Sequence, residues 1–161
     1  MLVVEWTPDS SGWNALWELI DAVGQRAWAE DAAEWHLASR FLVAEEGGAP
    51  LGFLRWVVQA VGSEDGGEPF RLDGKVLLEA KVLAFAVAPE ARRRGTGRQL
   101  QEHLIDLGWR ESLYQVRSHT SGESQANHAL KLSLGFALHP VKRGSDERGA
   151  YFLLPLGGRS T

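Results

Sequence analysis

Hydrophobic positions recur along the chain with two different spacings, and these spacings predict a mixture of strands and helices. Alternating or short continuous apolar runs predict seven strands. The expected strands are Leu2–Trp6, Phe41–Glu45, Pro50–Val61, Val76–Ala88, Leu113–His119, Phe136–Val141 and Tyr151–Leu156. Gly47 and Gly48 separate the second strand from the third, which indicates a hairpin.

Four helices are expected between these strands. In the first, apolar residues recur at helical spacing, and a polar residue ahead of them can cap the helix. The apolar face consists of Trp13, Leu16, Trp17, Ile20 and Val23, and the candidate caps are Asp9, Ser10 and Ser11. The other helices are expected at residues 28–39, 97–110 and 124–134. The resulting order, βααβββαβαββ, predicts a mixed α/β fold.

The length of 161 residues suits a single domain, 1–161, and 44% apolar residues are enough for a buried core. Residues 62–74 are polar and rich in Gly, so we expect a long loop of the kind that can take part in binding. The longest apolar run, Val82–Ala88, is far too short to span a membrane, and Met1 is not followed by a basic leader segment. These features favour a cytoplasmic protein with no membrane partner.

Composition excludes several kinds of chemistry. The chain has no Cys, which rules out disulfides, thiolate metal sites and a cysteine nucleophile. Its five His residues show no metal-ligand spacing and are not accompanied by a carboxylate cluster. The sequence therefore predicts no metal site.

Charge is distributed unevenly along the chain. Residues 1–80 contain 5 Lys and Arg against 14 Asp and Glu, whereas residues 81–161 contain 12 against 7. The acidic first half argues against nucleic-acid binding. Either the imbalance is chance variation of a solvated surface, or the basic half serves an anionic ligand and the acidic half a cationic one.

Residues 87–100 combine the features of a phosphate site. A predicted strand ends at Pro89, and a helix begins after a turn that contains Gly95 and Gly97. The first turn of a helix offers free N–H groups and partial positive charge, and glycines let a phosphate approach the backbone. Charge-assisted contacts can come from Arg92, Arg93, Arg94 and Arg98. The segment predicts a nucleotide-diphosphate site, and the simpler alternative is a helix start with solvated arginines.

The segment Arg92–Gly97 resembles the Arg/Gln-x-x-Gly-x-Gly/Ala signature of the GNAT superfamily of N-acetyltransferases. The strand Leu83–Pro89 ahead of it is similar to the family's, and so is the Leu134-Gly135-Phe136 run that ends the helix expected at 124–134. The specific resemblance covers about residues 79–136. It implies a GNAT fold, a twisted, mixed and mostly antiparallel sheet with helices on both faces.

The resemblance also implies acetyl-CoA as the acyl-donor substrate. The backbone of Phe85, Ala86 and Val87 would then bind the pantetheine as an added strand would, and the strand Val116–His119 would splay away to admit the thioester. An amide near Val87 would donate to the oxyanion that forms on the thioester.

Two further segments are assigned to the cofactor by the same resemblance. The amides from Arg93 to Arg98, that of Thr96 among them, would hold the pyrophosphate. Ser124 stands where many members of the family have Asn, and Asn127 follows about one helical turn later. We include both in the candidate cofactor site.

Direct attack of an amine on the thioester requires a base, an oxyanion donor and an acid for the leaving thiolate. His119 is the first candidate base because imidazole titrates near neutrality, and its alternative role is structural, at a strand end. Glu79 is the second candidate, although pairing with Lys81 on the same strand face would make it a poor base. Lys131 stands where many members have a Tyr acid, and it either protonates or pairs with the thiolate, or is a solvated helix residue.

The first half of the chain is rich in tryptophan, with Trp13, Trp17, Trp28 and Trp35 close together in the sequence. These rings can pack in the core between helices. Alternatively, some of them form an aromatic wall for an apolar or cationic acceptor, with nearby acidic residues supplying negative charge.

We therefore expect an N-acetyltransferase that transfers acetyl to a primary amine of a small molecule or peptide. One alternative is a non-catalytic acyl-CoA-binding or sensing module, which the missing Asn and Tyr equivalents favour. Another is a protein-interaction domain that docks through its Trp-rich half. A monomer or homodimer is expected.

Overall fold

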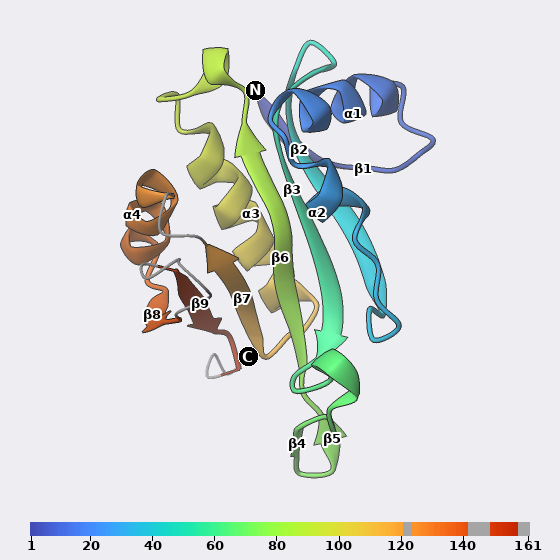
Figure 1. Ribbon diagram of the computed structural model, residues 1–161, viewed down its shortest axis with the longest axis vertical. Coiled ribbons are helices and arrows are strands. Elements are labelled where there is room, and N and C mark those ends of the chain that lie inside the picture. Colours follow the sequence, from blue (N-terminus) through green and yellow to red (C-terminus); the bar gives the residue numbers. More distant parts are fainter. Residues whose placement is uncertain (121–123, 142–148, 158–161) are drawn as a thin grey trace.

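The computed structural model describes residues 1–120, 124–141 and 149–157, and its core is a seven-stranded sheet (Figure 1). The strands lie in the order β1-β2-β3-β6-β7-β9-β8. Every neighbouring pair is antiparallel except β6 and β7, which are parallel. The strands are β1 (Leu2–Trp6), β2 (Ala38–Glu46), β3 (Ala49–Ala60), β6 (Leu78–Val87), β7 (Gln115–Thr120), β8 (Ala137–Pro140) and β9 (Ala150–Pro155).

Helices cover both faces of this sheet. One apolar cluster joins α1 (Trp13–Ala22) and α2 (Arg26–Glu30) to inward residues such as Phe41 and Phe53. The other joins α3 (Thr96–Arg110) to residues of opposite strand parity, such as Leu42 and Leu54. Because successive side chains of a strand point to opposite faces, the two clusters lie on opposite sides of the sheet. The expected fold class is confirmed.

The fourth helix, α4 (Gln125–Ser133), lies beside the beginning of α3. The Arg98 guanidinium donates a hydrogen bond of 2.6 Å to Ser133 Oγ, which links the two helices. This contact places the end of α4 next to the arginine-rich turn that precedes α3.

The helix expected at residues 28–39 is wrong in its extent. Only α2 is helical, and Asp31 after it has an extended conformation with φ −54° and ψ 128°. The buried Arg55 side chain donates to the Trp28 carbonyl at 2.8 Å, and the amide of Leu37 donates to Val58 at 2.8 Å. These two bonds hold the segment after α2 against the sheet. Its tertiary contacts therefore outweigh the helical spacing of its apolar residues.

The predicted polar cap of the first helix is also wrong. Gly12 is the N-cap of α1, and no side chain caps the helix. A Cβ at this position would lie 2.2 Å from the ring of Trp6, so only glycine fits beside the indole. Ser10 Oγ instead accepts a hydrogen bond of 2.9 Å from the Thr7 amide.

The expected loop at 62–74 is more structured than its composition indicates. It contains a short 3-10 turn, η1 (Glu64–Gly66), and leads into a hairpin of β4 (Arg71–Leu72) and β5 (Lys75–Val76). Figure 1 shows this hairpin projecting from the lower end of the sheet. The strand expected at Val76–Ala88 is divided as a result, since β6 begins only at Leu78. Apart from the hairpin and the 3-10 turns, the order of elements follows the prediction.

The parallel strands β6 and β7 separate halfway along their length. Their pairing runs from Glu79 opposite Gln115 to Val82 opposite Ser118. Beyond this point β6 stays paired with β3 as far as Val87, and β7 stays paired with β9 as far as Thr120 (Figure 1). The expected splay is therefore present, and it opens the sheet between two strands that remain fixed on their outer sides.

Candidate active site

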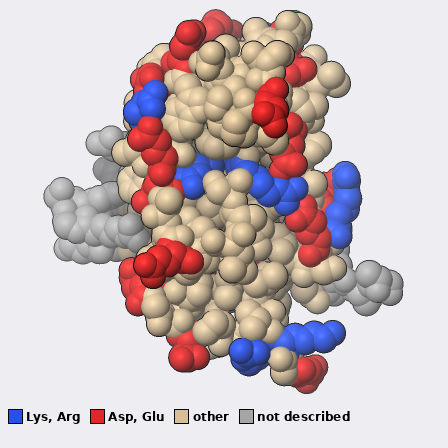
Figure 2. Space-filling model, turned by 90° about the vertical axis from the view of Figure 1, so that its right-hand side faces the viewer, with Lys and Arg blue, Asp and Glu red and all other residues tan. Residues whose placement is uncertain are grey.

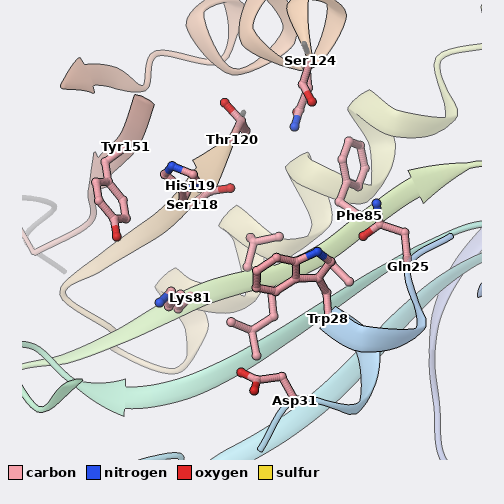
Figure 3. A pocket seen from close by; sticks show the side chains of 14 residues that line it. Gln25, Trp28, Asp31, Lys81, Phe85, Ser118, His119, Thr120, Ser124 and Tyr151 are labelled. Carbon is pink, nitrogen blue, oxygen red and sulfur yellow. The ribbon is translucent and has the colours of Figure 1, made fainter. Parts of the chain in front are cut away.

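A cavity of about 460 Å³ lies where β6 and β7 part (Figure 3). It is lined from four directions, by the α2 region, by β6, by the end of β7 with β9, and by the beginning of α4. The lining residues are Gln25, Trp28, Asp31, Lys81, Val82, Leu83, Ala84, Phe85, Ser118, His119, Thr120, Ser124, Asn127 and Tyr151.

The α2 wall presents an aromatic ring and a carboxylate. Trp28 is 57% exposed although it is a large apolar residue, and Figure 3 shows its indole extending over the cavity, near Asp31. The bond from the buried Arg55 guanidinium to the Trp28 carbonyl holds this wall on the sheet, and Arg55 also donates to Ser39 Oγ at 3.0 Å. Trp28 thus fits the wall interpretation, whereas Trp13 and Trp17 pack edge-on against Phe41 in the core.

The opposite wall carries polar groups from the end of β7. His119 lies opposite Tyr151 of β9 in the sheet, with 5.0 Å between the ring centroids. Figure 3 shows Ser118, His119 and Thr120 together at this edge of the cavity. Thr120 Oγ1 and Asn127 Oδ1 are buried and have no hydrogen-bond partner among the residues that the structure describes. Such atoms normally bind a ligand or water, so this wall is suited to a polar guest.

Lys131 lies in an apolar setting close to the cavity. Its side chain is fully buried, and Nζ lies 5.5 Å from the ring centroid of Phe85 and 5.7 Å from that of Phe136. Within the described part of the chain, Nζ has no hydrogen-bond partner. Burial lowers the pKa of this amine to about 7. The alternative of a solvated helix lysine is therefore wrong, and the group can both hold and release a proton near neutrality.

Glu79 does not reach the cavity. It is 1% exposed and binds Arg117 at 3.0 Å, Gln115 at 2.7 Å and Gln59 at 2.8 Å. The predicted pairing with Lys81 is wrong, because Lys81 Nζ binds Glu64 at 2.5 Å. A buried carboxylate held by a guanidinium and two amides is an unsuitable base for a substrate in the cavity. Of the three catalytic candidates, only His119 lines it.

The glycine-rich turn before α3 has the form of an anion site. Gly95 is its N-cap with φ +77°, a left-handed conformation that disfavours residues with a Cβ. The first helical bond joins the amide of Gln99 to Gly95, so the earlier amides lie outside the helical ladder. A Cβ at Gly97 would lie 3.1 Å from the ring of Phe85, which brings this turn directly behind the β6 edge.

The arginines of this turn and Thr96 bind different partners. Arg94 pairs with Glu46 at 2.7 Å, and Arg92 reaches the Val87 carbonyl at 3.4 Å. Arg93 and Arg92 are exposed, and Arg93 has φ +63°. Thr96 is buried and its hydroxyl donates to the Ala91 carbonyl at 3.3 Å. The turn therefore carries positive charge on its outer side and is fixed from within by Thr96.

The structure brings only some of the predicted cofactor residues to the cavity itself. Phe85, Ser124 and Asn127 line it, whereas Ala86 and Val87 continue the same strand edge toward the turn at 92–98. Tyr151 and Lys81 also line the cavity and were missed. Tyr151 could have been found only from its pairing with His119, which joins distant parts of the chain.

The acidic first half of the chain does not form a uniform negative surface. Figure 2 shows the face at the right of Figure 1, where a band of Lys and Arg crosses between acidic side chains. Arg26 pairs with Asp21 at 2.5 Å, and Arg40 pairs with Glu111 at 2.7 Å and with Glu5. Among the described lining residues, Asp31 is the only acidic side chain that the first half contributes to the cavity. Ion pairs therefore offset part of the acidic charge of the first half, and Asp31 is the part of it that reaches the described cavity wall.

The mixed sheet opens between its two parallel strands, beside a helix that begins at a glycine N-cap. This is the arrangement expected for a GNAT acetyltransferase. The profile of the acetyltransferase (GNAT) domain matches residues 38–138. The chain belongs to the GNAT acetyltransferase family, and the expectation of an acyltransferase is confirmed. Among the described residues, no helix is long and apolar enough to cross a membrane.

Individual relatives agree with this assignment. The [ribosomal protein bS18]-alanine N-acetyltransferase of Salmonella typhimurium is 36% identical over 74 residues, which cover 46% of this chain and 50% of that protein. The match thus spans about half the length of this curated relative. The structure of the Escherichia coli ribosomal-protein-S18-alanine N-acetyltransferase has a TM-score of 0.66 at 21% identity, covering 99% of this chain and 97% of the other.

A eukaryotic structure shares the fold at lower identity. Arabidopsis thaliana NAA60, solved in complex with acetyl-CoA, has a TM-score of 0.68 at 13% identity, covering 96% of this chain and 99% of that one. This likeness shows the fold alone.

Proposed function

We propose that this chain transfers the acetyl group of acetyl-CoA to a primary amine of a small molecule or peptide. The observation that carries the proposal is the opening between β6 and β7, which joins the glycine-capped start of α3 to a cavity with His119 on its wall. We refer to β6 beyond Val82 and residues 92–98 as the donor side. The acceptor side comprises Gln25, Trp28, Asp31, Lys81 and Tyr151.

The donor side fits the chemistry of acetyl-CoA. Among the described residues, the edge of β6 that faces the opening has no strand partner beyond Val82, so its amides and carbonyls can bind an extended amide-containing chain. The free amides at the start of α3 and the exposed arginines suit a pyrophosphate. Bound acetyl-CoA supplies the acetyl group as a thioester.

His119 is the proposed base. Its ring lies at the end of β7, on the wall opposite Trp28 and Asp31, so an amine held between them would lie within reach directly or through one water. The imidazole takes the proton that the nitrogen loses as the C–N bond forms and the C–S bond breaks. An amide of the β6 edge near Val87 donates to the oxygen that gains charge.

Lys131 is the proposed source of the proton for the leaving thiolate. Its pKa of about 7 leaves part of the population protonated at neutral pH, and its contact with Phe85 connects it to the cavity wall. As a cation it also stabilises a nearby thiolate. This role replaces the Tyr that many family members have at the same position.

The test is a measurement of thiol release from acetyl-CoA with a panel of amines. The panel contains a peptide with a free N-terminal alanine, because the relatives named above are alanine N-acetyltransferases. Turnover with at least one amine supports the proposal. Tight binding of acetyl-CoA with no turnover on any amine would overturn it in favour of a non-catalytic binding module.

A further inference from the structure

A network of charged side chains meets the acceptor side at Lys81 and Tyr151, and Glu64 links this network to the loop after β3. Glu64 Oε1 accepts hydrogen bonds from Lys81 Nζ at 2.5 Å, from Gln59 Nε2 at 2.9 Å and from Arg117. Although burial opposes its ionisation, hydrogen bonds from Lys81 and Gln59 and the charge of Arg117 hold the pKa of Glu64 at about 2. One carboxylate oxygen thus receives three donors, two of them cationic.

The network balances its charges only because Glu64 takes part. Glu79, which is buried, accepts a hydrogen bond from Arg117 at 3.0 Å. Lys81 forms an ion pair with Glu64, and it lines the cavity. Arg117 in turn lies over the ring of Tyr151, 5.4 Å from its centroid, and Tyr151 lines the cavity as well. Two carboxylates therefore offset two cations that border the acceptor.

This balance decides which charge a guest meets on the acceptor side. Lys81 and Asp31 are the residues with full charges among the described residues that line the cavity. Since Lys81 is already paired with Glu64, a carboxylate on the bound amine would meet a neutralised lysine and the carboxylate of Asp31 among the described lining residues. A positive or neutral group would meet Asp31 and the exposed indole of Trp28, which attract cations.

We propose that Glu64 is a specificity-determining residue, which makes the site select primary amines that carry no carboxylate on the carbon next to the nitrogen. This inference rests on the proposed function and narrows its acceptor class. Peptide N-termini and alkyl diamines have the selected chemistry, whereas free amino acids do not. Glu64 acts without touching the reacting atoms, by neutralising Lys81 and Arg117.

Alaninamide and alanine provide a matched pair of substrates, because they differ only in the carboxylate. The wild-type protein is expected to acetylate alaninamide, an alanine-terminated peptide and a diamine in preference to alanine. Glu64→Gln keeps a hydrogen-bond acceptor but removes the charge, and it should lower the ratio of kcat/KM for alaninamide over alanine about tenfold. The KM for acetyl-CoA should stay unchanged, because Glu64 is remote from residues 92–98.

Glu68→Gln is the matched control, since Glu68 is exposed on the same loop. It should leave the ratio at the wild-type value. A ratio in Glu64→Gln within twofold of wild type, or an equal change in Glu68→Gln, would overturn the inference. The peptide and diamine arms show whether the selected amine is a peptide terminus, a small molecule or both.

A second measurement does not depend on turnover. Glu64→Ala leaves a space beside Lys81 and Arg117 that formate can occupy as a substitute carboxylate. Formate at a fixed ionic strength should raise the Tm of Glu64→Ala relative to chloride and leave that of the wild type unchanged. If no amine is acetylated, the proposed function fails while this result still tests the charge network. Equal Tm values of Glu64→Ala in formate and chloride would overturn the role of Glu64.

Discussion

The donor side and the acceptor side of the cavity are built by different means. The donor side comes from one continuous stretch, the end of β6 with the turn and the start of α3, and in the proposed function backbone groups make most of its contacts. The acceptor side is assembled from the α2 region, β6 and β9, and its side chains are held by distant partners, among them Glu64 in the loop after β3. A backbone site binds one constant group, whereas a side-chain site can change its specificity with few substitutions.

The largest effect is expected for His119, the proposed base that would act on both the donor and the acceptor. His119→Ala should lower kcat by about 10²- to 10⁴-fold, the usual contribution of a positioned base. The Kd for acetyl-CoA should not change, because the donor side remains intact. Pre-steady-state rates and equilibrium binding measure the two quantities separately. A wild-type rate at all pH values would remove His119 as the base.

A substitution at Gly95 should break the donor side alone. Gly95→Val forces a β-branched residue into a conformation with φ +77°, which costs about 1–3 kcal/mol and moves the amides that hold the pyrophosphate. Acetyl-CoA should bind about 10- to 100-fold more weakly by calorimetry. Gly74→Val is the control, because Gly74 has φ +78° in the hairpin and lies outside the cavity. Equal loss of affinity in both variants would contradict the assignment of this turn.

The buried amine of Lys131 should make the free energy of unfolding depend on pH. Its pKa is about 7 in the folded protein and 10.5 when solvated, so the unfolded chain binds more protons between these values. The free energy of unfolding should therefore rise with pH from about 7 to 10.5 relative to Lys131→Met, by the linkage of proton binding to folding. Denaturant titrations of both proteins across this range measure the difference. Parallel stability curves would show that the amine is not buried as described.

The smallest effect is expected on the acceptor side. Trp28→Ala removes the exposed indole but keeps the backbone carbonyl that binds Arg55. The KM for a cationic amine should rise about three- to tenfold, as expected for loss of a partly exposed cation–π contact, while kcat and the KM for acetyl-CoA stay the same. Leu37→Ala, at another exposed apolar residue that does not line the cavity, is the control. An unchanged KM would show that the indole does not contact the acceptor.

The same contrast explains how much could be predicted from the sequence. Residues 87–100 carry strand, turn and helix in a local order, so the element order and a phosphate site were predicted from the sequence pattern. The strand edge proposed for acetyl-CoA came from the resemblance to the family. The contacts of the acceptor side were not predicted, because they join segments far apart in the chain. The partner of Lys81 is 17 residues away at Glu64, and that of Glu79 is 38 residues away at Arg117.

The error at residues 28–39 has the same physical origin. Helical spacing is a property of the segment itself, whereas the bond from Arg55 to Trp28 belongs to the folded sheet. Together with the bond from Leu37 to Val58, this contact holds against the sheet a segment whose local preference favoured a helix. Trp28, whose carbonyl Arg55 binds, and the nearby Asp31 both line the cavity.

The separation of β6 from β7 has a consequence for the behaviour of the sheet as a whole. An unpaired strand edge is ordinarily a place where a second polypeptide can add itself, and proteins protect such edges against aggregation. Here the free edge lies in the middle of the sheet, flanked by β7 and covered on one side by α3 (Figure 1). The protein thereby keeps an open set of backbone hydrogen bonds for a slender guest while shielding it from other chains.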